Sequence, residues 1–171
     1  MAPPRLELAV QYGVASPNVP SRAQFRRWVR KALARDARIT IRVVGQAEGR
    51  ALNRSFRGKD YATNVLTFIF REQAPHEGDL AICAPVVSRE AREQKKSVMA
   101  HYAHLTVHGV LHLQGYDHEN EADAAAMEGL ETEIVTAFGY PDPYGAERRA
   151  LPAPTKPRTP TSHVRSRCPH R

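Results

Sequence analysis

The sequence predicts a single domain of the α/β (α+β) class, with a small four-stranded sheet packed by about five helices. Segments with the two-residue alternation of a strand are interleaved with segments whose apolar residues recur every three or four positions. The chain has 171 residues, which is enough for one domain with its own core. No run approaches the ~18 apolar residues of a membrane span, and the N-terminus has no apolar core of signal-peptide length.

The N-terminal part of the chain is expected to form two strands and two helices in alternation. The strands are expected at residues 6–12 and 38–44, where apolar and polar side chains alternate. Ser21 with Gln24 three residues later is the signature of a capping box at a helix start. A second, short helix is expected at residues 46–56. The apolar residues at helical spacing behind the capping box are Phe25, Trp28, Val29, Ala32 and Leu33.

Two more strands and three more helices are expected in the rest of the domain. The strands are placed at residues 65–70 and 80–84, joined by a loop that contains Pro75, Gly78 and Asp79. Pro85 suits the first turn of a helix, and Asn120 can cap the last one. The three helices are expected at about residues 85–96, 98–114 and 121–138.

Residues 1–139 form the predicted domain, and residues 140–171 are predicted to be a disordered basic tail. The tail holds seven prolines, which interrupt any periodicity. The two cysteines, Cys83 and Cys168, do not suggest a disulfide framework. A reducing cytosol therefore fits the chain.

The net charge of +7 is distributed unevenly along the chain. Residues 1–100 carry 18 basic and 9 acidic side chains, whereas residues 101–139 carry seven acidic side chains and no Lys or Arg. A basic body attracts polyanions, of which nucleic acid is the commonest, although a solubility role is an equal alternative. The polar face of the helix that begins near Ser21 holds five cations and is either solvated or in contact with RNA: Arg22, Arg26, Arg27, Arg30 and Lys31.

Three histidines, His108, His112 and His118, predict a metal centre. The first two are four residues apart, which puts them on one face of a helix. Gly115 allows a left-handed helix end, after which the chain can return His118 toward the same point. Three protein ligands with a fourth position left open are typical of catalytic zinc sites. The alternative is that these are partly buried polar residues on a helix face.

His104 lies one turn before His108 and competes as a ligand. Eight residues of helix span ~12 Å, whereas a Zn–N bond is ~2.0 Å, so His104 and His112 cannot both bind one ion. The ion can therefore be bound by His104 with His108 or by His108 with His112. Because His118 lies nearer His108 and His112, His104 is expected to pack beside the site. Asp117 either orients an imidazole or assists proton transfer, or it simply forms a turn.

Gly109 separates this motif from that of zinc peptidases. The pattern H-E-x-x-H-x-x-G-x-x-H matches His108, His112, Gly115 and His118, but Gly109 stands where the peptidase has its glutamate base. The predicted site is therefore poorly equipped for peptide hydrolysis by that mechanism.

Arg57 and Lys59 lie in a polar loop between a predicted helix and a predicted strand. Arginine can bind a phosphate in bidentate fashion. A loop arginine is, however, more often merely exposed, so the residues alone leave both interpretations of Arg57 open.

Three stretches together resemble the bacterial YbeY family, and the resemblance covers about residues 5–139. They are Arg-Gly-Lys-Asp-Tyr-Ala-Thr-Asn-Val-Leu-Thr-Phe (57–68), Gly-Asp-Leu-Ala-Ile (78–82) and His-Gly-Val-Leu-His-Leu-Gln-Gly-Tyr-Asp-His (108–118). One departure is Ala62, where the family usually has proline; it bears on the stiffness of the loop.

The resemblance implies a cytoplasmic, single-strand-specific, metal-dependent endoribonuclease that acts in ribosomal RNA maturation, at the 3′ end of 16S rRNA, and in ribosome quality control. It also implies a mixed sheet and one Zn²⁺ per chain, another transition metal being possible. The implied partners are single-stranded RNA, rRNA, and the small ribosomal subunit with its proteins; neither DNA nor a membrane is expected. The family's metal-ligand roles fall on His108, His112 and His118, and its catalytic roles on Arg57 and His108.

Two other functions remain as alternatives at this point. One is a metallopeptidase-like hydrolase with an unusual base. The other is a non-catalytic, RNA-binding ribosome-assembly factor with a structural metal.

Overall fold

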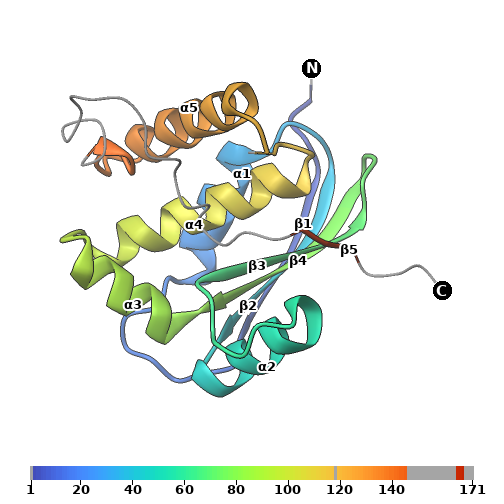
Figure 1. Cartoon of the computed structure of the whole chain (residues 1–171). Coiled ribbons are helices and arrows are strands. Elements are labelled where there is room, and N and C mark those ends of the chain that lie inside the picture. The colour runs from blue at the N-terminus through green and yellow to red at the C-terminus, as the bar shows by residue number, and fades with distance from the viewer. Residues whose placement is uncertain (1, 118, 146–164, 168–171) are drawn as a thin grey trace.

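A computed structural model describes residues 2–117, 119–145 and 165–167 of the chain. It confirms the predicted fold class, because helices pack on both faces of a mixed sheet (Figure 1). The strands are β1 (Leu6–Tyr12), β2 (Ala37–Val44), β3 (Val65–Arg71), β4 (His76–Cys83) and β5 (Arg165–Arg167). The helices are α1 (Arg22–Ala32), α2 (Gln46–Arg57), α3 (Ala84–Glu93), α4 (Val98–Leu113) and α5 (Glu121–Ala137). None of the described helices is long and apolar enough to span a bilayer.

The strands lie in the order β1-β2-β4-β3-β5. The pairs β1/β2 and β2/β4 are parallel, so each needs a crossover that leaves the sheet. By contrast β3 and β4 pair antiparallel, as consecutive strands joined by a short connection can. The sheet is therefore mixed, with β3/β4 as its antiparallel pair.

The two faces of the sheet carry different helices. The main core lies between the sheet and helices α1, α4 and α5, which occupy one side (Figure 1). Successive side chains of a strand point to opposite faces, so Val65 of β3 joins this core while Leu66 and Phe68 point the other way. On that second face Leu52 of α2 packs against them.

The helix starts follow the local sequence signals. In the capping box of α1, the Ser21 hydroxyl accepts from the Gln24 amide at 3.2 Å, and the Gln24 side chain accepts from the Ser21 amide at 2.8 Å. The Asn120 side chain accepts from the Asp123 amide at 2.8 Å and caps α5, as predicted.

Strand β4 is longer than predicted, and its extra residues were wrongly assigned to a loop. Gly78 and Asp79 lie within the strand, paired with Ile39 and Thr40 of β2 on one side and with β3 on the other. A Cβ at Gly78 would lie 2.4 Å from the Phe68 carbonyl oxygen and 2.6 Å from Leu113 Cδ1. The glycine therefore allows a close approach of α4 and β3 rather than a turn, which local sequence does not reveal.

Part of the predicted tail also belongs to the described structure. Residues 165–167 form β5, which pairs in parallel with residues 67–69 of β3. Residues 140–145 follow α5 directly, and the Tyr140 ring packs edge-on against Trp28 of α1, with centroids 6.4 Å apart. Residues 146–164 and 168–171 lie outside the described residues, so for them disorder stays a prediction.

Candidate metal centre

Helix α4 carries two of the three predicted ligands side by side. Its residues from Ala100 to Leu113 are buried, apart from the half-buried His104, because α4 lies between the sheet and α5 (Figure 1). His108 is 6% exposed and His112 is 3% exposed, and their ring centroids are 4.6 Å apart. The four-residue spacing therefore brings the two imidazoles together as predicted.

The carboxylate of Glu131 on α5 fixes the orientation of His108. Glu131 is fully buried and accepts a hydrogen bond from His108 Nδ1. Burial alone would raise the pKa of the Glu131 carboxyl, but the charges and hydrogen bonds of His108 and His104 hold this pKa well below its usual range. The carboxylate stays ionised, and with Nδ1 engaged the Nε2 atom of His108 is the one available to a ligand.

His104 is directed toward the same carboxylate. Its Nε2 atom lies 3.2 Å from the Tyr144 hydroxyl oxygen and 3.6 Å from Glu131 Oε2. The Tyr144 hydroxyl in turn donates to Glu131 Oε2. His104 therefore packs beside His108 and Glu131, and its exclusion from the ligand set stays a prediction.

Sequence reasoning missed Glu131 and Tyr144. Glu131 lies four residues after Met127 and three before Ile134, on the buried stripe of α5. A carboxylate in an apolar stripe was the available signal, since such a group is rarely buried without a partner. Tyr144 had no comparable signal, because it follows the helix in a proline-containing segment.

The end of α4 has the predicted geometry. Gly115 has a φ of +101°, its amide donates to the His112 carbonyl at 3.0 Å, and the Tyr116 amide donates to the Leu111 carbonyl at 3.1 Å. These two bonds are those of a Schellman motif, which reverses the chain after a helix. Asp117 follows, half-buried, and its role stays a prediction.

His118, the third predicted ligand, lies outside the described residues. Within the described part of the chain, no three His, Cys, Asp or Glu side chains are grouped so as to hold a metal ion. The described donors nevertheless suit a transition metal: two adjacent imidazoles, one of them held at Nδ1 by a carboxylate. The assignment of His108, His112 and His118 as metal ligands therefore stays a prediction.

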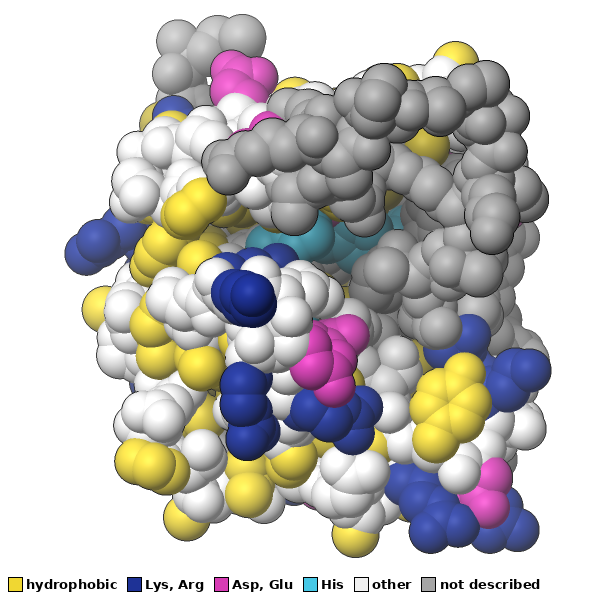
Figure 2. Space-filling model, turned by 60° about the vertical axis from the view of Figure 1, so that its left-hand side comes forward, with side chains coloured by type: hydrophobic (Ala, Val, Ile, Leu, Met, Phe, Trp, Pro, Cys, Tyr) yellow, Lys and Arg dark blue, Asp and Glu magenta, His cyan; other side chains and the backbone are white. Residues whose placement is uncertain are grey.

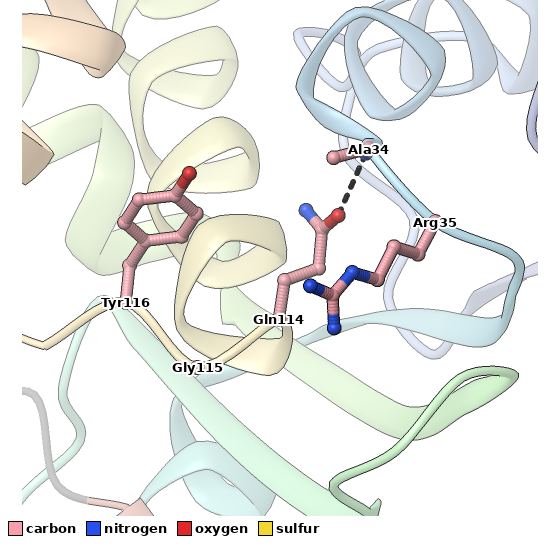
Figure 3. Close-up of a pocket in the computed structure, with 5 residues that line it drawn as sticks. All are labelled: Ala34, Arg35, Gln114, Gly115 and Tyr116. Carbon is pink, nitrogen blue, oxygen red and sulfur yellow. Dashed lines mark hydrogen bonds between the residues drawn. The ribbon is translucent and has the colours of Figure 1, made fainter.

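A hollow of about 280 Å³ lies beside the same turn, lined by Ala34, Arg35, Gln114, Gly115 and Tyr116 (Figure 3). There the Gln114 side chain ties α4 to the end of α1, accepting from the Ala34 amide and donating to the Ala32 carbonyl, both at 2.7 Å. Because Gln114 faces α1 whereas His108 faces α5, this hollow is separate from the histidine centre.

Arg57 is the last residue of α2, and the loop after it is braced. Gly58 closes the helix with a φ of +69°, a left-handed conformation that favours glycine. In the loop, Asp60 accepts two hydrogen bonds of 2.8 Å from Arg50, one from Nε and one from Nη2. Arg57 itself is half-buried, while Lys59 is exposed. Lys and Arg side chains are seen beside the hollow that holds the histidines (Figure 2).

A partly buried hydrogen-bond network links this loop to the histidine helix. Asn64, at the end of the loop, donates to Glu90 of α3 at 2.9 Å, and Glu90 lies 3.1 Å from Nε2 of His101 on α4. Burial favours a raised pKa for the Glu90 carboxyl, but the hydrogen bonds from His101 and Asn64 lower this pKa overall. The ionised Glu90 carboxylate thus connects the loop to α4 and fixes their relative position.

Gly109 faces the sheet and has no room for a side chain. A Cβ there would lie 2.4 Å from Cδ2 and 2.9 Å from Cγ of Leu80, which is itself fully buried. A glutamate at this position would be driven into β4 instead of reaching a substrate. The peptidase base is therefore excluded by packing as well as by sequence.

Gly109→Ala is expected to lower the free energy of unfolding by about 1–3 kcal/mol, because overpacking against Leu80 outweighs the better helix propensity of alanine. Gly129→Ala is the matched control, since its Cβ would meet no atom within 4 Å. That change should stabilise the protein by about 0.5–1 kcal/mol. Urea unfolding measures both, and equal effects of the two changes would contradict the packing argument.

Two adjacent buried imidazoles, one of them hydrogen-bonded to a buried carboxylate, place the chain in the class of small mixed α/β proteins with a histidine centre. A sequence model of the family "Endoribonuclease YbeY" matches residues 16–139. The chain belongs to the YbeY endoribonuclease family. It is therefore an endoribonuclease, a hydrolase that acts on RNA.

Individual relatives agree with this assignment. The "Endoribonuclease YbeY" of Nitrosomonas eutropha is 58% identical over 137 residues, covering 80% of this chain and 97% of the relative. That of Methylobacillus flagellatus is 53% identical over 146 residues, covering 85% and 98%. The solution structure of TM1509 from Thermotoga maritima has a TM-score of 0.58 and 26% identity, covering 83% and 92%. The metallopeptidase and non-catalytic alternatives gain no support from these relatives.

Proposed function

We propose that this chain is a single-strand-specific, metal-dependent endoribonuclease of ribosomal RNA maturation, acting at the 3′ end of 16S rRNA and in ribosome quality control in the cytoplasm. The observation that carries the metal part is the pairing of His108 with His112, 4.6 Å apart between ring centroids, with His108 Nδ1 held by a buried carboxylate. A metal-binding histidine typically has its other ring nitrogen engaged in this way.

The proposed ligands are His108, His112 and His118, and the proposed ion is one Zn²⁺ per chain, another transition metal being possible. Imidazole suits zinc, and three protein ligands leave a position for substrate or water. A bound zinc ion would supply Lewis acidity toward a phosphoryl oxygen.

The protein's own residues would divide the remaining work. Arg57 would bind the scissile or an adjacent phosphate and offset the negative charge that develops during cleavage. Glu131 would hold His108 in one tautomer and one orientation.

The exposed face of α1 is the proposed surface for the RNA backbone and for rRNA in the small ribosomal subunit. Elsewhere Arg38, Arg42 and Arg50 each pair with a carboxylate. On α1, by contrast, four exposed cations have no carboxylate within 4.0 Å among the described residues: Arg26, Arg27, Arg30 and Lys31. Unpaired cations are available to phosphates and to counterion release.

The purified protein is expected to contain about one transition metal per chain and to cut unstructured RNA but not a matched duplex. A chelator should abolish cleavage, and added Zn²⁺ should restore it. Elemental analysis and gel assays of both RNAs measure this, with casein as the control substrate. Metal-independent cleavage would refute the metal role. Metal content with RNA binding but no cleavage would instead favour a structural metal.

A further inference from the structure

We propose that Tyr144 is a positioning residue for the metal centre, which it orders through Glu131 and His108. The inference rests on the proposed metal role of His108. It assigns part of the centre to the segment after α5, beyond the residues that the family model matches.

The segment that carries Tyr144 is fixed against the domain at several points. Tyr140 packs on Trp28, as described above. The Thr132 hydroxyl of α5 donates to Asp142 Oδ1 at 3.3 Å, and the same oxygen accepts from the Tyr144 amide at 2.9 Å. A further turn bond joins the Gly145 amide to the Asp142 carbonyl at 3.0 Å. A turn at Asp142, which is hydrogen-bonded to α5, thus fixes the backbone position of Tyr144.

The Tyr144 hydroxyl completes the binding of a buried carboxylate. It donates to Oε2 of Glu131, while His108 Nδ1 donates to Oε1. Without the Tyr144 hydroxyl, Oε2 would face only His104 Nε2, which lies 3.6 Å away. The carboxylate group could then still rotate about its terminal torsion, which has no sharp staggered minima. Two donors on different oxygens fix the plane of the carboxylate and, through it, the plane of the His108 ring.

His104 holds the tyrosine in turn. With the Tyr144 proton directed at Glu131, the tyrosine oxygen accepts from His104 Nε2 at 3.2 Å. His104 therefore contributes to the centre through Tyr144 and Glu131 rather than as a ligand. His104, His108, Glu131 and Tyr144 thus form one connected set of contacts between α4, α5 and the segment after α5.

The experiment compares Tyr144→Phe with Tyr140→Phe in the full-length protein. Each change removes one hydroxyl from the same segment, and no hydrogen bond of the Tyr140 hydroxyl is found among the described residues. Zinc affinity is measured by competition with a chromophoric chelator. We expect Tyr144→Phe to weaken zinc binding about tenfold, as loss of an outer partner of a ligand does, and Tyr140→Phe to change it less than twofold.

A second readout uses no metal. In the apo protein, NMR of the histidine rings reports the Nδ1 proton of His108, which a hydrogen bond to Glu131 moves downfield. This resonance should shift or broaden in Tyr144→Phe and remain in Tyr140→Phe. Wild-type affinity and an unchanged resonance in Tyr144→Phe would overturn the inference, as would equal losses in both variants. If the wild-type protein binds no transition metal, the proposed function fails, and the resonance alone decides the role of Tyr144.

Discussion

Arg57→Ala is expected to slow single-turnover cleavage of unstructured RNA by ~10²-fold or more, while metal content and fold stay unchanged. Arg57 ends α2, whereas the imidazole pair lies on α4, and Arg57 is not one of the proposed metal ligands. Its effect should arise from a charge-assisted contact made chiefly in the transition state. Arg57→Lys should recover only part of the rate, since an ammonium group cannot reproduce the bidentate fork.

The matched control is Arg54→Ala, which removes an exposed arginine one turn earlier on the same helix. It should leave the cleavage rate within about twofold of wild type, because nonspecific binding is shared among many cations. Metal analysis of the same preparations accompanies the rates. A wild-type rate in Arg57→Ala would refute its catalytic role, and loss of metal would make the residue structural.

His112→Ala is expected to lose most of the bound metal and, with it, RNA cleavage. Each of three ligands carries a large share of the binding free energy, and the remaining two imidazoles leave the coordination incomplete. His118→Ala should behave in the same way. His104→Ala should keep one metal per chain, because its Nε2 is directed at Tyr144 and Glu131.

Elemental analysis after dialysis measures the metal content of all three variants, and thermal unfolding of the apo proteins checks that each is folded. Full occupancy in His118→Ala would remove that residue from the ligand set. Loss of metal in His104→Ala, with occupancy retained in His112→Ala, would shift the pair one turn toward the N-terminus of α4.

The features of this protein that the sequence predicts depend on residues that lie close together in the chain. The capping box of Ser21 and Gln24, the cap at Asn120 and the turn at Gly115 each depend on residues within one helical turn. The pairing of His108 and His112 is likewise a property of one helix, since residues four apart share a face. The fold class, most of the helices and strands, and the pairing of His108 with His112 therefore follow from short-range patterns, whereas the full extent of β4 and strand β5 do not.

Contacts between elements that are distant in sequence were decided only by the tertiary structure. Glycine is common in turns, but Gly78 lies in a strand. It is glycine because Leu113 and β3 approach its backbone too closely for a side chain. Glu131 meets His108 across 23 residues of chain, and Tyr144 meets His104 across 40, so no local period connects them. Packing chose these partners: a carboxylate enclosed between two helices is stable only where donors from other elements reach both of its oxygens.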